Sequence, residues 1–320
     1  MLEFNLSSRI SKATAIASCR KNDDFDDLSQ DREAMSANSR RHRYFNTYQS
    51  QQWRRKDDGL YINKDVDYKQ VRGQAYALRA FCYFNMTRVW GELPLVLEPL
   101  KDATDNYLIA KSDTATVYNQ ISLDLDSALL FLPESYTSSK TTISKMTSGA
   151  VNSIYTDLYM WRHQYDNALA SSQKVIAKTT NYKLTSLTDA TLPENSSYAL
   201  MFTKGGSTET IFEVDYNFAE RGARSLYVQV YGDLGFQPAF QASEKIMTIF
   251  SPNDLRAKIA YNDNRAITKF FERVGFNRGQ MDDNEIISYR LADILLLRAE
   301  ALNKKNRVVE AIAIVNQMRV

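Results

Sequence analysis

The chain has few of the residues from which common catalytic and metal sites are built. Its 320 residues include only 2 Cys and 2 His, and neither His42 nor His163 has a second metal ligand at a suitable spacing. The HExxH, CxxC, GxSxG, Walker A and GxGxxG motifs are all absent from the sequence. These absences argue against a metalloenzyme, a hydrolase with a serine triad and a nucleotide-dependent enzyme. We expect no metal and no cofactor.

Excess charge and long apolar runs are missing as well. The 40 Lys and Arg residues against 38 Asp and Glu give a net charge of +2, which is too balanced to predict a nucleic-acid-binding surface. No stretch reaches the roughly 18 apolar residues of a membrane-spanning helix. With 44% hydrophobic residues and only 11 Gly and 6 Pro, the chain can nevertheless bury a large core. We therefore expect a globular protein.

The strongest local pattern lies in residues 71–89, where apolar residues recur at steps of three and four on one helix face. This face comprises Val71, Ala75, Leu78, Cys82 and Val89, and it is widened by Ala77, Phe81 and Phe84. Gly91 suits a left-handed C-terminal cap, and Pro94 prevents the helix from resuming. The pattern predicts a buried helix that ends near Gly91 and leads into an extended segment.

Further along the chain, the helical pattern is repeated. A second helix over residues 117–132 is predicted to pack on the first. Two later segments share one helix-turn-helix plan, because Ala168 aligns with Ala311 at an offset of 143 (311 − 168) and Leu158 aligns with Ala301 at the same offset. The plan is similar to the tetratricopeptide repeat, whose helical pairs bury their apolar faces by stacking on each other. We predict three helical pairs.

A long segment of different character, residues 182–285, separates the second pair from the third. Gly and Pro residues divide it into short stretches, with a strand expected around Ile211 and Val214 and another over residues 267–271. The predicted fold is mainly α, with tetratricopeptide-like pairs in a right-handed superhelical scaffold that carries an irregular, partly β insertion. The expected division is an N-terminal arm and helix (1–67), helical pairs 1 and 2 (68–181), the insertion (182–285) and helical pair 3 (286–320).

Several motifs occur in a fixed order along the chain. The first helix contains Arg79-Ala80 and Tyr83-Phe84, and Gly91 and Pro94-Leu95 follow it. Three further stretches are VYNQISLDLDSALLFLP at 117–133, TETIFEVDY at 208–216 and SYRLADILLLRAEALN at 288–303. Together these motifs resemble the signature of the SusD/RagB family, the outer-membrane nutrient-binding lipoproteins of Bacteroidetes. The resemblance covers most of the chain from about Tyr44 onward.

This resemblance implies a single SusD-like domain that binds an oligosaccharide or another nutrient and is not an enzyme. It also implies a lipid-anchored protein on the outer-membrane surface that delivers its ligand to a SusC-like, TonB-dependent transporter. The ligand site would lie on irregular segments outside the helical repeats. Family members are longer than this chain, so we expect it to be shortened at both ends.

Sugar binding requires aromatic faces for stacking and polar groups for the hydroxyls. The insertion offers such a cluster in Tyr227, Tyr231, Phe236 and Phe240, interleaved with Gln229, Asp233 and Gln237. Trp53, which Gln51, Gln52 and Arg54 flank, is a second candidate on the N-terminal side. We therefore nominate Trp53, Tyr227, Tyr231 and Phe236 as ligand-binding residues, while core packing remains the alternative for each.

Cys19 is a candidate for lipid attachment. Residues 16–19, Ile-Ala-Ser-Cys, have the shape of a bacterial lipobox, and the family resemblance favours lipidation of the natural protein. The preceding residues include Arg9 and Lys12, so they do not form the apolar stretch of a signal peptide. An ordinary cysteine therefore remains the alternative, and membrane attachment depends on whether Cys19 is processed.

Two other functions remain open. A glycosidase needs two carboxyl groups across the scissile bond, and Glu209 with Glu213 or Asp215 is the pair that could be nominated. However, Glu213 and Asp215 alternate with apolar residues, as solvent-facing strand positions do. A tetratricopeptide-type adaptor would bind a peptide and no glycan, but it would leave the long insertion unexplained.

Overall fold

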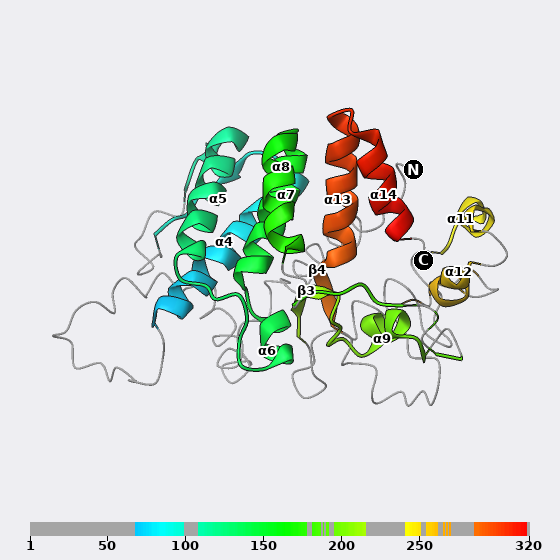
Figure 1. The fold of residues 1–320 in the computed structure, drawn as a ribbon. Coiled ribbons are helices and arrows are strands. Elements are labelled where there is room, and N and C mark those ends of the chain that lie inside the picture. Colours follow the sequence, from blue (N-terminus) through cyan, green and yellow to red (C-terminus); the bar gives the residue numbers. More distant parts are fainter. Residues whose placement is uncertain are drawn as a thin grey trace, which may run out of the picture. The chain divides into compact units, whose positions relative to one another are not determined.

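The structure is a computed structural model. It describes residues 68–98, 108–177, 195–215, 241–250, 254–261 and 285–318, together with residues 181–186, 188, 190, 191, 265, 267 and 269. These residues fall into two compact units, the first within Met1–Glu134 and Met146–Tyr155 and the second within Ser135–Lys145 and Thr156–Val320. Most of the regular structure is helical, which confirms the predicted mainly α fold (Figure 1). Among the described helices, none has both the length and the hydropathy needed to cross a membrane.

In the first unit, helix α4 (Tyr68–Trp90) packs against helix α5 (Thr114–Leu129). The two segments approach closely at Gly73, where an added Cβ would lie 2.8 Å from Leu132 Cδ2. Asp113 begins α5, because its Oδ1 accepts a hydrogen bond from the Thr116 amide at 2.8 Å. The predicted packing of the second helix on the first is therefore confirmed.

The end of α4 agrees with the prediction, and its buried face agrees in part, because Ala77 and Phe84 are fully buried as predicted. Gly91 has a φ of +73°, and its N–H donates to the Thr87 carbonyl at 2.9 Å, as in a left-handed cap. The most buried face comprises Gly73, Ala77, Ala80, Phe84 and Thr87. Val89, predicted to be in the core, is 47% exposed. Small residues define this face because they let α5 approach, and a search for large apolar residues overlooks them.

After the cap the chain is extended, as predicted. Strand β1 (Leu93–Pro94) pairs antiparallel with strand β2 (Lys111–Ser112). The Tyr83 hydroxyl accepts a hydrogen bond from the Val96 amide at 2.7 Å and so ties the extended segment to α4. The extended segment after Gly91 is therefore held against α4.

The internal repeat is present in the structure. Helices α7 (Ser148–Trp161) and α8 (Tyr165–Ile176) correspond to α13 (Leu291–Lys304) and α14 (Val308–Gln317), and the first bounds differ by the predicted 143 residues (291 − 148). In the second unit, α13 packs against both α8 and α14. The predicted small residues Ala168 and Ala311 are both buried. A core cluster of Ala299, Leu302 and Ala311 is covered by Leu169, Ile314 and Val315.

In the second unit, a two-stranded antiparallel sheet joins two segments that lie far apart in the chain. Strand β3 (Thr210–Val214) pairs with strand β4 (Ile286–Arg290), and β4 runs directly into α13 (Figure 1). Helix α6 (Ser139–Ser144) packs against β3. The predicted strand at Ile211 and Val214 is confirmed. Residue Ile267, predicted to start another strand, forms an isolated bridge with Tyr261 instead.

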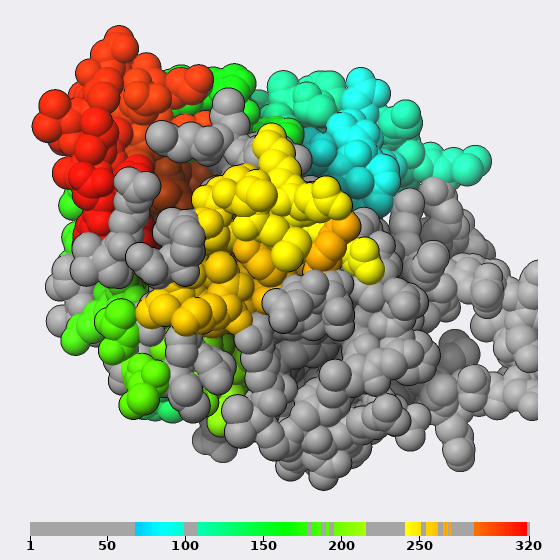
Figure 2. All heavy atoms as spheres, turned by 90° about the vertical axis from the view of Figure 1, so that its right-hand side faces the viewer, coloured from blue at the N-terminus to red at the C-terminus, as the bar shows by residue number. Residues whose placement is uncertain are grey.

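The described part of the insertion contains three short helices that the prediction missed. They are α9 (Ser197–Thr203), α11 (Glu244–Ile249) and α12 (Leu255–Ala260), and Figure 2 shows α11 and α12 in yellow on the surface of this unit. Ser196, Ser243 and Asp254 cap their N-termini, each through a side-chain oxygen that accepts from a backbone amide. These capping residues are the sequence signal from which the three short helices could have been predicted.

Candidate functional site

The residues nominated for ligand binding and lipidation, Trp53, Tyr227, Tyr231, Phe236 and Cys19, lie outside the described residues. They remain predictions. What the structure does describe is the base of the insertion, which consists of α9 and β3 within it, β4 directly after it, and the side chains that join them. Residues 216–240, which carry the predicted aromatic cluster, follow β3 in the sequence.

The base is held by a buried ion pair. Arg290, at the end of β4, donates from Nη1 to Glu209 Oε1 at 3.2 Å, and Glu209 is 2% exposed. The second carboxylate oxygen, Oε2, accepts from the Thr185 amide at 2.9 Å and from its hydroxyl at 2.6 Å. Burial alone would lower the pKa of Arg290, but the nearby carboxylates of Asp293 and Glu209 outweigh it and raise that pKa. The charged Arg290 guanidinium therefore joins the end of β4 to Glu209, next to β3.

An aromatic and cationic cluster joins α9 to the later part of the insertion. The Lys269 ammonium lies 3.9 Å from the centre of the Phe202 ring and 5.8 Å from that of Tyr198. The Arg290 guanidinium lies 5.5 Å from the same Phe202 ring. Burial lowers the pKa of Lys269. Phe202 thus links α9 to residue 269 and to the end of β4.

The expectation that Glu213 faces solvent is wrong, because the residue is 1% exposed. Register irregularities between Thr210 and Phe212 and between Phe212 and Glu213 disturb the alternation of side chains, so four consecutive β3 residues are buried. Glu213 Oε1 accepts weakly from the Gly206 amide at 3.4 Å, and Oε2 has no hydrogen-bond partner in the described part of the chain. Burial raises the pKa of Glu213 to about 7.

The neighbours of Glu213 include other acidic groups and one lysine. Lys140, from α6, lies 3.1 Å from Asp215 Oδ1 and 4.0 Å from Glu285 Oε1. Asp215 has a side chain that is 37% exposed, so its expected orientation toward solvent is compatible with the structure. Gly205 comes so close to Glu285 that an added Cβ would lie 2.2 Å from Glu285 Cγ. No metal-binding group of three His, Cys, Asp or Glu residues occurs within the described ranges.

This geometry does not favour the glycosidase alternative. Both carboxylate oxygens of Glu209 are engaged by Arg290 and Thr185, and Glu213 is enclosed by protein. A pair of catalytic carboxyl groups must reach a substrate that lies between them. Neither of these two residues is presented in that way.

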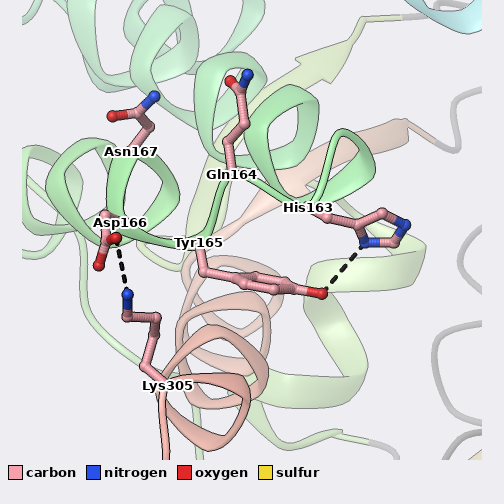
Figure 3. Close-up of a pocket in the computed structure, with 6 residues that line it drawn as sticks. All are labelled: His163, Gln164, Tyr165, Asp166, Asn167 and Lys305. Carbon is pink, nitrogen blue, oxygen red and sulfur yellow. Dashed lines mark hydrogen bonds and ion pairs between the residues drawn. The ribbon is translucent and has the colours of Figure 1, made fainter.

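A separate hollow of about 350 Å³ lies at the turn between α7 and α8, and the sequence analysis did not anticipate it (Figure 3). Its lining consists of His163, Gln164, Tyr165, Asp166, Asn167 and Lys305. Lys305 Nζ lies 2.8 Å from Asp166 Oδ2, and the Tyr165 hydroxyl lies 3.2 Å from His163 Nδ1. Figure 3 shows these two contacts on opposite sides of the start of α8. The hollow therefore combines an aromatic ring, two amides and a neutralised ion pair.

Two family models match the sequence. The SusD-like model described as "Starch-binding associating with outer membrane" matches residues 58–160, and the model described as "SusD family" matches residues 237–320. The SusD-like protein P38 of Formosa agariphila is 30% identical over an alignment 296 residues long, which covers 78% of this chain and 56% of that protein. The chain thus spans little more than half the length of this relative.

Solved structures share the fold. The chain aligns with surface glycan-binding protein A from Bacteroides uniformis at a TM-score of 0.62 and 19% identity, covering 84% of this chain and 60% of that one. A structure described as a laminarin binding SusD-like protein aligns at a TM-score of 0.59 and 20% identity, covering 75% of this chain and 62% of that one. At these identities the similarity shows a common fold.

Proposed function

Because the chain belongs to the SusD/RagB family, we propose that it is a glycan-binding protein of the bacterial cell surface. It captures an oligosaccharide and delivers it to a SusC-like, TonB-dependent transporter. The observation that carries this proposal is the position of the two family matches. The first match, residues 58–160, includes α4 and α5, and the second, residues 237–320, includes α11 to α14.

The glycan site is proposed to lie on the insertion, with Tyr227, Tyr231 and Phe236 as stacking platforms and Trp53 as a further contact. Support comes from the way the described base is built. Glu209, Arg290 and Phe202 connect β3, β4 and α9 through an ion pair and cation–π contacts. A rigid base is suited to presenting binding residues on the segments that it carries.

The proposed role is binding without catalysis. Glu209 and Glu213, the carboxyl groups that could be nominated for glycoside hydrolysis, are buried inside the second unit. A binding protein needs only stacking surfaces and hydrogen-bonding groups, which the sequence of the insertion supplies in abundance. Release of reducing sugar that disappears in Glu213→Gln would establish the enzyme instead.

The proposed location is the outer-membrane surface, with a lipid on Cys19 as the anchor of the natural protein. The support is the lipobox-like sequence before Cys19 and the family to which the chain belongs. Metabolic labelling with a palmitate analogue in a Bacteroidetes host tests this part of the proposal. Label retained by Cys19→Ala would show that this cysteine is not the lipid attachment site.

The decisive experiment measures retention in affinity gels and isothermal titration against plant, host and microbial glycans. The protein is compared with Tyr231→Ala and Phe236→Ala, and Tyr118→Ala on α5 serves as an aromatic control in the helical scaffold. Loss of a stacking ring is expected to weaken binding by about 1 kcal/mol. Failure of the folded protein to bind any glycan would overturn the function, whereas binding unaffected by either insertion variant would overturn only the site.

A further inference from the structure

The backbone turn between α7 and α8 does not by itself require the side chains that line the hollow. His163 and Asn306 occupy equivalent positions in the two helical hairpins and have φ values of +58° and +60°. The next residues, Gln164 and Arg307, also share one conformation, with φ and ψ of −91° and 67° against −90° and 56°. The same backbone turn is therefore built twice.

The side chains on these two turns differ sharply. Tyr165 and Asp166, which line the hollow, correspond to Val308 and Val309 in the second hairpin. The backbone consequently accepts aliphatic residues at both positions. A tyrosine and an aspartate on the first turn are thus not demanded by its conformation, and their presence calls for another explanation.

Two polar contacts restrain side chains that line the hollow. His163 Nδ1 lies 3.2 Å from the Tyr165 hydroxyl, which restrains the ring of Tyr165. On the other side, Lys305 reaches from the end of α13 to Asp166 at 2.8 Å and joins the turns of the two hairpins. In Figure 3 the side chains of Gln164 and Asn167 extend upward from the start of α8, on the side away from Lys305 and the Tyr165 ring. A ligand here would meet an aromatic ring and an ion pair that each already have one polar contact.

The chemistry of the hollow favours a neutral, hydroxyl-rich ligand. Its lysine is neutralised by an aspartate, so it presents no net positive charge to attract a phosphate or a carboxylate. The tyrosine supplies an apolar face, and the amide, imidazole and carboxylate groups supply donors and acceptors for hydroxyls. A volume of about 350 Å³ is at the small end of ligand sites and accommodates one or two sugar rings rather than a long chain.

We propose that this hollow binds a sugar unit of a glycan chain as an additional carbohydrate contact on the helical scaffold, separate from the insertion. The inference rests on the proposed glycan-binding function and assigns it a second place on the molecule. Tyr165 is the stacking residue of this contact. A contact of this kind adds avidity for long chains that reach both places and little for short ones.

The test uses the full chain with three polysaccharide probes, laminarin, amylopectin and arabinoxylan, and with the trisaccharides derived from each. Tyr165→Val removes the ring and copies the residue that the second hairpin carries at the equivalent position, so the variant is expected to fold. Tyr165→Phe keeps the ring and loses the hydroxyl contact to His163. Tyr231→Ala reports on the insertion. Circular dichroism confirms that every variant is folded before binding is measured.

We expect Tyr165→Val to bind the recognised polysaccharide about threefold to tenfold more weakly and its trisaccharide unchanged, and Tyr165→Phe to stay within about twofold of the unaltered protein. If the unaltered protein binds a polysaccharide and Tyr165→Val binds it equally well, the second contact is refuted while the proposed function stands. If none of the three polysaccharides binds to the unaltered protein, this inference fails together with the proposed function for these glycans.

Discussion

His163 and Asn306, 143 residues apart in the chain (306 − 163), hold the same left-handed backbone conformation at the turns of two helical hairpins. Both follow the C-terminal end of a long helix and precede a shorter one. Left-handed conformations are uncommon outside glycine, and His and Asn are among the residues that tolerate them best. The repetition shows that this conformation is part of the hairpin design.

The left-handed turn makes Asn306 sensitive to the type of side chain. We expect Asn306→Val to lower the free energy of unfolding by about 1–2 kcal/mol, because a β-branched residue is strained at positive φ. Asn306→Gly should be within about 0.5 kcal/mol of the unaltered protein, since glycine adopts this conformation freely. Urea unfolding measures both. Asn303→Val, at an exposed position of α13, controls for the low helix propensity of valine, and an equal loss in that control would contradict the argument from backbone strain.

Gly205 and Gly206 offer a matched pair that separates backbone strain from steric clash. Both have positive φ, +64° and +70°, but only at Gly205 would an added Cβ meet another residue, 2.2 Å from Glu285 Cγ. Gly206→Ala should cost about 1 kcal/mol of unfolding free energy from backbone strain alone. Gly205→Ala should cost at least about 1 kcal/mol more, because the buried Glu285 side chain must move.

The unfolding free energies of Gly205→Ala and Gly206→Ala are compared by urea unfolding, both in the unaltered protein and in Glu285→Ala. Replacing Glu285 with alanine removes the clashing Cγ. The difference in unfolding free energy between the two glycine variants should therefore be smaller in Glu285→Ala. If this difference were the same with and without Glu285, the contact with Glu285 would not be its cause. This double-mutant design isolates one contact at the base of the insertion.

Local signals explain what the sequence predicted correctly. The cap at Gly91 depends on the helix that precedes it, and the repeat was visible because Ala168 and Ala311 stand at equivalent places in two hairpins. These features are encoded within a single helix or helix pair, where periodicity and small residues are direct evidence of structure. The mainly α fold follows from the same kind of pattern.

Features that depend on distant pairing were missed. Glu213 alternates with apolar residues in the sequence, but irregular pairing with β4, more than 70 residues further along the chain, buries it. The hollow at Tyr165 also depends on Lys305, which lies 139 residues from its partner Asp166. In α4, Gly73 is buried because Phe131 and Leu132, just after α5, approach it, which no property of residue 73 alone reveals. The predicted ligand residues Tyr231 and Phe236 lie outside the described residues, so the structure leaves them as predictions.

The buried ion pair between Arg79 and Asp124 is expected to be essential for the stability of the first unit. Arg79 Nε donates to Asp124 Oδ2 at 2.6 Å, Nη2 contacts the other oxygen, and Asp124 is almost completely buried. Asp124→Asn should lower the free energy of unfolding by about 3–5 kcal/mol, because it leaves the arginine charge without its partner. In the exposed pair of Arg307 and Glu310, Glu310→Gln should lower the free energy of unfolding far less, because water screens this pair.

The two ion-pair variants are compared by urea or thermal unfolding at neutral pH. Raised salt should weaken the Arg307–Glu310 contribution and leave the Arg79–Asp124 contribution nearly unchanged, because only the exposed pair is screened. Equal losses for Asp124→Asn and Glu310→Gln would show that the buried pair tolerates an amide in place of its carboxylate.

Glu213 is expected to make the protein less stable as the pH rises toward neutrality. Burial raises the pKa of this carboxyl group from 4.5 to about 7, so between these values the folded protein holds a proton that the unfolded chain has released. The unfolded state then binds fewer protons than the folded state, and stability falls with increasing pH over this interval and levels off above it. The upper limit of the effect at pH 8 is about 3 kcal/mol.

The variant Glu213→Gln should remove this dependence, because an amide of similar shape has no proton to lose. Its unfolding free energy should exceed that of the unaltered protein at pH 8, and the difference should shrink as the pH falls toward 5. Glu244→Gln, at a carboxylate whose side chain is 88% exposed, should show no such pH-dependent difference. Because β3 leads directly into residues 216–240, glycan affinity measured at pH 5.5 and 8 in the same variants would show whether the charge at Glu213 also affects binding. Identical pH profiles for Glu213→Gln and the unaltered protein would mean that the buried carboxyl group is ionised without cost, which requires a compensating partner within reach of its second oxygen.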